Sequence, residues 1–158
     1  MKVSVVIPTY NGADFIAGTL QTVLNQTFSD FEVVVSDDAS SDGTMAAVES
    51  IGDSRVAISE DRSHVGPGGN WNRAVALARG EYIKVLAQDD MLYPRNLEVA
   101  VEVLDADPAL SFVATRRDVI GADGTVLMHG RGLSGLCGRI APTTGVRRTV
   151  RSGANQFG

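Results

Sequence analysis

The stretch Gly80–Pro94, GEYIKVLAQDDMLYP, decides the fold because it joins a strand pattern to a polar turn and a helix start. Residues 82–86 have the aromatic, β-branched and aliphatic content of a short buried strand. Pro94 is suited to the first turn of a following helix. We therefore expect Asp89 and Asp90 at the carboxyl end of a strand, which is where ligands bind in an open α/β sheet.

The two adjacent carboxylates leave two interpretations open. Neighbouring carboxylates repel each other unless a cation or hydrogen-bond donors offset their charge, so one interpretation is a site for a divalent metal and a phosphate. The other is a turn or a helix N-cap in which aspartate makes only local hydrogen bonds. The dipeptide alone fits both, and the choice depends on the rest of the chain.

The composition predicts one globular domain and argues against a nucleic-acid-binding protein. The 158 residues are 44% hydrophobic, and the net charge is −5. All 19 acidic residues and nine of the 14 basic ones lie in residues 1–123, which therefore carry −10, whereas the tail carries five arginines and no acid. A basic tail predicts contact with an anionic partner or with a membrane surface. The tail arginines are Arg131, Arg139, Arg147, Arg148 and Arg151.

Cysteine usage and the absence of a targeting signal predict a cytoplasmic protein that is at most peripheral to a membrane. Cys137 is the only cysteine, so no intrachain disulfide can form and a reducing compartment is expected. The sequence shows no signal peptide and no apolar run of about 18 residues. His64 and His129 lack metal-ligand spacing, and we interpret both as ordinary loop residues.

Strand and helix patterns alternate along the chain with short loops, which predicts an α/β fold with a doubly wound, mainly parallel sheet. We expect a glycine-rich loop at residues 66–69, a left-handed helix cap at Gly80 and a hairpin turn at residues 122–124. From Gly130 onward the pattern is loop-rich or disordered. The expected strands are residues 3–7, 31–36, 56–58, 82–86 and 109–114, and the expected helices are residues 16–24, 44–51, 70–78 and 94–105.

Three of these strands end in polar residues, at Pro8–Asn11, at Asp37-Asp38 and at Asp89-Asp90. The carboxyl ends of parallel strands lie on one edge of a sheet, so the three segments should meet there. The chain has neither the G-x-G-x-x-G of a dinucleotide site nor the Gly-Lys-Ser/Thr of a P-loop. A cation held by carboxylates is then the remaining obvious way to neutralise a phosphate, and Mg²⁺ and Mn²⁺ prefer such oxygen ligands.

The same segments resemble a known family. Val3–Asn11 (VSVVIPTYN), Gln26–Phe28 with Phe31–Thr44 (FEVVVSDDASSDGT), and Gly80–Pro94 resemble the donor half of the family 2 inverting glycosyltransferases over roughly the first 115 residues. The resemblance implies the GT-A fold of nucleotide-diphospho-sugar transferases. It divides the chain into a nucleotide-sugar-binding domain, residues 1–128, and the loop-rich start of an acceptor-side segment, residues 129–158, where we expect the chain to be truncated.

The resemblance also assigns roles to five residues. Pro8 and Tyr10 match residues that pack against and contact the nucleotide base, and Asp37 matches a carboxylate that reads the base, typically a uracil N–H. Asp89 matches a residue near the ribose and the metal, and Asp90 matches the direct ligand of the Mg²⁺ or Mn²⁺ that bridges the diphosphate. For Pro8, Tyr10 and Asp37 a simple strand-end turn remains open from the residues alone.

One position departs from the family pattern. Many relatives read Asp-x-Asp-Asp, whereas this chain has Ala87 at the first position, which weakens the inferred ribose contact. Arg62, Asn72 and Arg73 are candidates for contacting the diphosphate, and a solvated surface position fits each of them equally well.

The function that the resemblance implies is metal-dependent transfer of a sugar, with inversion, from a nucleotide-diphospho-sugar such as a UDP-sugar. The acceptor would be a saccharide or a lipid-linked chain in cell-wall or polysaccharide biosynthesis, and the protein could form a homo-oligomer. The alternative is a catalytically incomplete nucleotide-sugar-binding module without a general base. No acidic residue follows Asp123, and Gly153–Gly158 resembles the stretch that precedes the base in the family.

Overall fold

The structure is a computed structural model that describes residues 1–121, 123–132, 138–141 and 143–144. It divides into two compact units, residues 1–102 and residues 103–158. Cys137, Arg147, Arg148, Arg151 and Gly153–Gly158 lie outside the described residues. No helix in the described part of the chain is long and apolar enough to cross a membrane.

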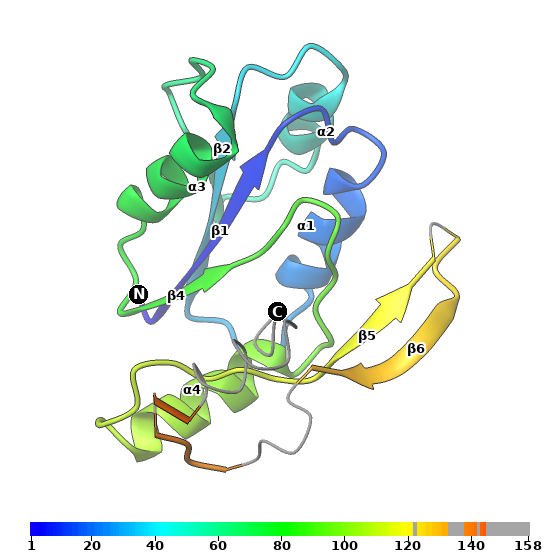
Figure 1. The fold of residues 1–158 in the computed structure, drawn as a ribbon. Helices are drawn as coiled ribbons and strands as arrows, with labels where there is room; N and C mark the ends of the chain where they lie inside the picture. The colour runs from blue at the N-terminus through cyan, green and yellow to red at the C-terminus, as the bar shows by residue number, and fades with distance from the viewer. Residues whose placement is uncertain (122, 133–137, 142, 145–158) are drawn as a thin grey trace. The chain divides into compact units, whose positions relative to one another are not determined.

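The first unit is built on a four-stranded parallel sheet with the strand order β3-β2-β1-β4 (Figure 1). The two central strands are entirely buried, because their near-continuous apolar sequence is covered on both faces. Thr9 pairs with Asp37 at the last register position, so the ends of β1 and β2 lie side by side. The strands are β1 (Val3–Thr9), β2 (Phe31–Asp37), β3 (Val56–Ile58) and β4 (Tyr82–Val85).

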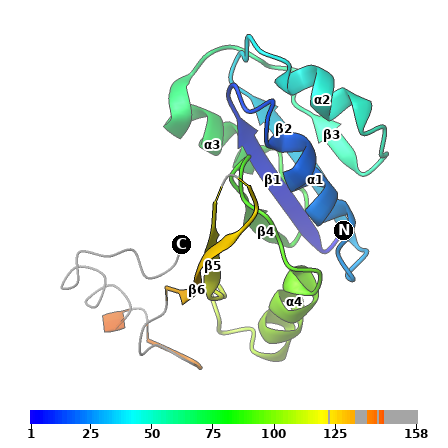
Figure 2. The same ribbon diagram turned by 90° about the vertical axis from the view of Figure 1, so that its right-hand side faces the viewer.

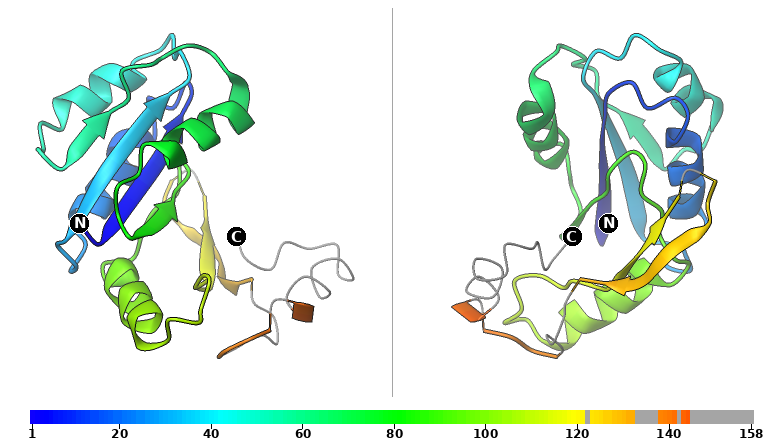
Figure 3. Two further views of the ribbon diagram at one scale, coloured as in Figure 1. Left: turned by 90° about the vertical axis from the view of Figure 1, so that its left-hand side faces the viewer. Right: turned by 45° about the vertical axis from the view of Figure 1, so that its right-hand side comes forward.

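Helices cover both faces of this sheet, as Figures 2 and 3 show. α1 (Ile16–Leu24) and α2 (Thr44–Ser50) lie on one face, and α3 (Gly66–Ala76) lies on the other against β1 and β2. A fourth helix, α4 (Asn96–Ala106), begins in the same unit. The doubly wound, mainly parallel α/β arrangement predicted from the sequence is confirmed.

Two glycine predictions for this unit are wrong in detail. Residues 66–69 are the first turn of α3 rather than a loop, since Pro67 is favoured at a helix start. Gly80 does not have a positive φ, so it is not a left-handed cap. Glycine is needed at this position because the backbone of β1 lies too close for a side chain. A Cβ on Gly80 would lie 2.5 Å from the amide nitrogen of Ser4 in β1.

The described part of the second unit contains an antiparallel hairpin of β5 (Arg117–Ile120) and β6 (Val126–Arg131). A hairpin turn joins the two strands as predicted, since the Gly121 amide donates to the Thr125 carbonyl at 2.8 Å, although Ala122 of the predicted turn lies outside the described residues. The prediction of a strand at residues 109–114 is wrong. Asp107 accepts hydrogen bonds from the amides that follow it and so forms a turn. The apolar residues after this turn pair with no other strand among the described residues. His129 lies on β6 beside Asp118 rather than in a loop. The division into residues 1–128 and 129–158 stays a prediction.

Candidate functional site

A cavity of about 300 Å³ lies beyond the carboxyl ends of β1 and β4. Its walls come from the end of β1, from the turn that follows β2, from the loop that follows β4, and from α3 with the segment before it. This is the edge of the sheet that the sequence predicts for the site. The lining residues are Pro8, Thr9, Tyr10, Asp38, His64, Pro67, Asn70, Trp71, Ala87, Gln88 and Asp89.

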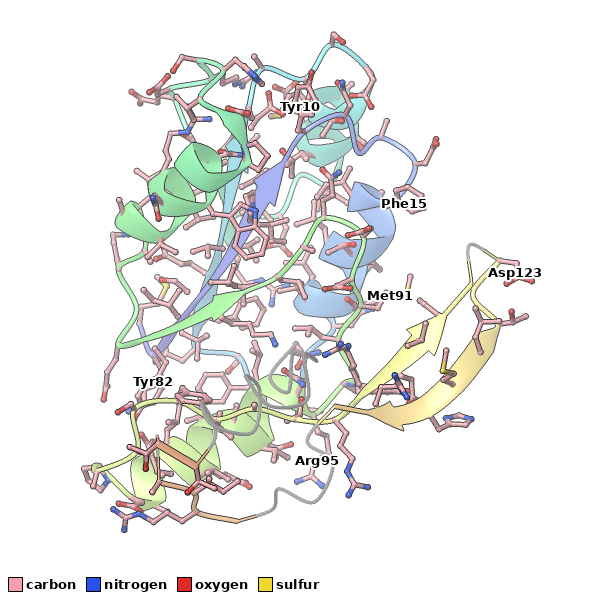
Figure 4. The ribbon with its side chains drawn as sticks, in the orientation of Figure 1. Tyr10, Phe15, Tyr82, Met91, Arg95 and Asp123 are labelled. Carbon is pink, nitrogen blue, oxygen red and sulfur yellow. The ribbon has the colours of Figure 1, made fainter. Side chains whose placement is uncertain are left out.

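Three rings give the cavity an aromatic wall. Tyr10 is 50% exposed and Trp71 is 45% exposed. The ring centroid of Tyr10 lies 5.6 Å from that of His64, with the two planes tilted by 49°. Figure 4 shows Tyr10 at this end of the sheet and Tyr82, at the start of β4, at the opposite end. Half-exposed rings on a concave wall are suited to stack on a flat ligand.

Asp37 is not on the cavity wall. Its side chain is buried, and its carboxylate accepts hydrogen bonds from the Thr9 hydroxyl at 3.2 Å and from both the amide and the hydroxyl of Ser40. Ser40 in turn accepts a hydrogen bond from the Asn11 amide at 2.9 Å. Asp37 therefore ties the loop after β1 to the loop after β2, beneath the predicted base contact.

Asp38, the next residue, lines the cavity although it is only 2% exposed. Its carboxylate accepts from the amides of Val65 at 2.7 Å and Gly66 at 3.0 Å. It thereby satisfies orphan donors at the start of α3, which no side chain of the helix itself caps. The His64 Nδ1 atom lies 3.1 Å from the same carboxylate, so Asp38 also holds the ring of His64 near the cavity.

The three candidates for contacting the diphosphate, Arg62, Asn72 and Arg73, do not line the cavity. Arg73 is 13% exposed and donates to the Ser36 hydroxyl at 3.0 Å and the Asp37 carbonyl at 2.7 Å, so it holds the sheet edge. Arg62 pairs with Glu49 at 3.6 Å. Asn72 is exposed on α3. The surface interpretation fits Arg62 and Asn72 better than a diphosphate contact within this cavity.

A larger open groove of about 620 Å³ runs beside β3, and Arg73 is the one predicted site residue among those that line it. The two arginines that line the groove already have partners. Arg73 donates to the Asp37 carbonyl at the sheet edge, and Arg79 pairs with the buried carboxylate of Glu32 at 2.6 Å. Burial would raise the pKa of Glu32, but hydrogen bonds from Arg79 and Ser4 bring that pKa below its usual value. The smaller cavity, which Pro8, Tyr10 and Asp89 line, is therefore the candidate site.

Asp89 and Asp90 are both exposed, and Asp89 lines the cavity whereas Asp90 does not. Burial lowers the pKa of the nearby Lys84 ammonium, although the Asp90 carboxylate opposes that shift. The described residues contain no group of three or more His, Cys, Asp or Glu side chains that could hold a metal ion. Two accessible carboxylates still fit Mg²⁺ or Mn²⁺, because such ions usually take one or two carboxylates together with substrate phosphates and waters.

The sequence does not identify His64, Trp71 or Gln88 as wall residues. The side chains of His64 and Trp71 reach the cavity only because α3 packs across β1 and β2. The pattern at residues 66–69 marks an unusual segment there, but it does not say which neighbours face the sheet edge. Gln88 lies inside the quoted motif, between Ala87 and Asp89, at a position where the resemblance assigns no role.

Comparisons with known proteins agree with this fold. The family model of glycosyl transferase family 2 matches residues 4–155. The succinoglycan biosynthesis protein ExoO of Rhizobium meliloti (strain 1021) is 40% identical over 126 residues, which cover 79% of this chain and 36% of ExoO. The structure of S. aureus TarS in complex with UDP has a TM-score of 0.63 and 34% identity, covering 67% of this chain and 32% of that one.

A second solved structure carries both a donor and a metal. The mannosyltransferase PcManGT from Pyrobaculum calidifontis, in complex with GDP-Man and Mn²⁺, has a TM-score of 0.63 and 31% identity, covering 76% of this chain and 36% of that one. The fold is therefore the GT-A fold of these solved structures. The chain belongs to glycosyltransferase family 2. It spans about a third of the length of ExoO.

Proposed function

We propose that this chain is the donor-binding part of a glycosyltransferase that uses a nucleotide-diphospho-sugar, with a UDP-sugar as the donor. The observation that carries the proposal is the cavity that brings Tyr10, Asp38 and Asp89 together at the sheet edge. The UDP complex of TarS supports this donor class. The GDP-Man complex of PcManGT shows that the fold also accepts a purine nucleotide, so the choice of uridine needs its own test.

In this proposal the base lies on the aromatic wall. Pro8 packs beneath the base, and the Tyr10 ring stacks on it. The carboxylate beside the base is Asp38 rather than Asp37, because Asp38 lies on the wall and Asp37 lies underneath, with its oxygens bonded to Thr9 and Ser40. Asp37 then supports the base contact without making it.

Asp89 and Asp90 would hold Mg²⁺ or Mn²⁺ together with the donor diphosphate. When bound, such an ion acts as a Lewis acid on the departing diphosphate. The exposed carboxylates alone would repel that anion, and the Mn²⁺ in the PcManGT complex supports a metal dependence here. Asp89 would contribute its carboxylate to the metal from the cavity wall, where it lies next to Gln88.

Transfer with inversion requires an acceptor hydroxyl that attacks the anomeric carbon from the face opposite the diphosphate, helped by a carboxylate base. Among the described residues, Asp38 and Asp89 are the only carboxylates that line the cavity, and both have other roles in this proposal. That observation favours the second candidate function, binding of the donor without transfer. The acceptor class we propose is a growing polysaccharide or a lipid-linked saccharide, which the similarity to ExoO supports.

Isothermal titration calorimetry with UDP, GDP and pyrophosphate, each with Mn²⁺ and with EDTA, tests the donor and the metal. We expect UDP to bind more tightly than GDP, and only with the metal. Equal UDP affinity in EDTA would contradict the metal assignment, and no UDP binding under any condition would contradict the proposal itself. Release of UDP from UDP-sugars with saccharide acceptors separates transfer from binding alone.

A further inference from the structure

The side chain of Gln88 forms a paired contact with the main chain of Tyr10. The Tyr10 amide donates to Gln88 Oε1 at 2.9 Å, and Gln88 Nε2 donates to the Tyr10 carbonyl at 3.1 Å. The two residues lie 78 positions apart in the chain. The Gln88 carboxamide therefore satisfies both the amide and the carbonyl of Tyr10, whose ring forms part of the cavity wall. The two hydrogen bonds resemble a pair between neighbouring β-strands.

Gln88 is itself held in place from two sides. Its main-chain carbonyl accepts a hydrogen bond from the Thr19 hydroxyl of α1 at 2.7 Å. Its side chain passes over Gly12, where a Cβ would lie 2.4 Å from both Cδ and Oε1 of Gln88. Real Cβ atoms do not approach so closely, so the carboxamide occupies this place only because residue 12 is glycine.

We infer that Gln88 is a positioning residue for donor binding, which holds the Tyr10 ring in register with the acidic pair that directly follows Gln88 in the chain. This inference rests on the proposed function. Tyr10 is placed on the base side of the donor and Asp89 on the diphosphate side, and the Gln88 carboxamide joins the two segments that carry them. A glutamine suits this task because it offers one acceptor and one donor in a single plane, which neither glutamate nor methionine does.

The first measurement does not depend on a donor. In the 158-residue chain, the Tyr10 amide should exchange its hydrogen slowly with solvent, and Gln88→Met, which keeps the length of the side chain and loses both hydrogen bonds, should make it exchange faster. Gly12→Ala should have the same effect, because the new methyl group displaces the carboxamide. Gly18→Ala and Gln21→Met are matched controls, since a Cβ at Gly18 finds ordinary space at 3.5 Å and Gln21 lies exposed on α1.

The second measurement uses the fluorescence of Trp71, the only tryptophan, which lies on the cavity wall. With Mn²⁺ present, Gln88→Met and Gly12→Ala should each weaken UDP binding about tenfold, as expected for the loss of one or two hydrogen bonds that orient the ring. Inorganic pyrophosphate, which lacks the base, should bind these variants as it binds the natural chain. Adding Gln88→Met to Tyr10→Ala should cost no further affinity, because the ring that Gln88 positions is then missing.

The outcomes distinguish a failure of the positioning role of Gln88 from a failure of the proposed donor-binding function. If the natural chain binds UDP and both variants bind it equally well, or if Tyr10 amide exchange is unchanged in Gln88→Met, the positioning role of Gln88 is overturned. If UDP and pyrophosphate weaken together, Gln88 supports the whole edge rather than the Tyr10 ring, and the inference is again overturned. If the natural chain binds no UDP, the proposed function falls and takes this role with it.

Discussion

The chain contains two Asp-Asp pairs, each at or beyond the carboxyl end of a parallel strand of one sheet, and the two pairs differ in their burial and hydrogen bonding. Asp37, the last residue of β2, and Asp38 are 1% and 2% exposed, and their carboxylates accept hydrogen bonds from Thr9, Ser40 and the start of α3. Asp89 and Asp90, after β4, are both exposed. The same dipeptide thus holds the fold together at one strand end and stays accessible to a ligand at the other.

The difference comes from the segments that reach each strand end. The loop after β2 is met by the loop after β1 and by the amides at the start of α3, so donors offset the charge of the Asp37 and Asp38 carboxylates. The loop after β4 lies toward the edge of the sheet, since β4 pairs with β1 alone. Buried carboxylates without donors are costly, so the first pair needs its partners for folding, and the second pair is accessible to an added cation.

The largest effect we expect is that of Asp37→Ala on stability. The substitution leaves the Ser40 amide and the Thr9 hydroxyl without their buried acceptor, and it should lower the free energy of unfolding by about 3 kcal/mol. Urea unfolding measures this change, with Asp89→Ala as the matched control that should change it by less than about 0.5 kcal/mol. Equal losses from the two variants would remove the distinction between the two pairs.

Asp38→Ala should cost somewhat less, about 2 kcal/mol, because the amides of Val65 and Gly66 at the start of α3 can partly turn to water. Hydrogen exchange at these two amides should rise more than exchange in β2. UDP affinity should fall as well, since Asp38 lies on the cavity wall and holds the His64 ring. Undisturbed exchange at Val65 and Gly66 would show that α3 does not depend on this carboxylate.

Much of this contrast could not be predicted from the sequence. The parallel order of β1, β2 and β4 follows from alternating strand and helix patterns, and the common edge of their polar ends follows from the order. The burial of Asp37 and the cap that Asp38 gives to α3 depend on partners up to 28 residues away. The Gln88 carboxamide meets Tyr10 across 78 residues. Local sequence patterns predict where strands end, but they do not predict which distant hydrogen-bond donors contact each strand end.

Asp90→Ala tests the exposed pair without disturbing the fold. UDP affinity measured with Mn²⁺ should fall at least about tenfold, toward the affinity measured in EDTA, whereas the melting temperature should fall only slightly, through the lost attraction between the exposed Asp90 carboxylate and the Lys84 ammonium. Glu49→Ala is the matched control, because it removes an exposed carboxylate of α2 that lies outside the cavity. A melting temperature that falls markedly with Asp90→Ala, together with unchanged UDP binding, would assign Asp90 to the local turn that the sequence also allows.

The smallest expected effect lies in the turn that directly follows the buried pair. Ala39 has a φ of +63°, a left-handed conformation that costs a residue with a Cβ about 1–2 kcal/mol. Glycine removes that strain but loses about 0.5–1 kcal/mol through the greater freedom of the unfolded chain. Ala39→Gly should therefore stabilise the protein by about 0.5 kcal/mol.

The control for this prediction makes the same chemical change at Ala46, an exposed position of α2. Ala46→Gly should destabilise the protein by about 1 kcal/mol, because glycine is a poor helix former. Opposite signs for the two substitutions in urea unfolding would locate strain in the turn after Asp38.

Asp37 and Asp38 fix both that turn and the start of α3. Combining Ala39→Gly with Asp37→Ala should therefore remove most of the gain in stability, because without the Ser40 contacts the turn is no longer held in the strained conformation. A gain that persists in full in the double variant would show instead that residues other than Asp37 impose the conformation of Ala39.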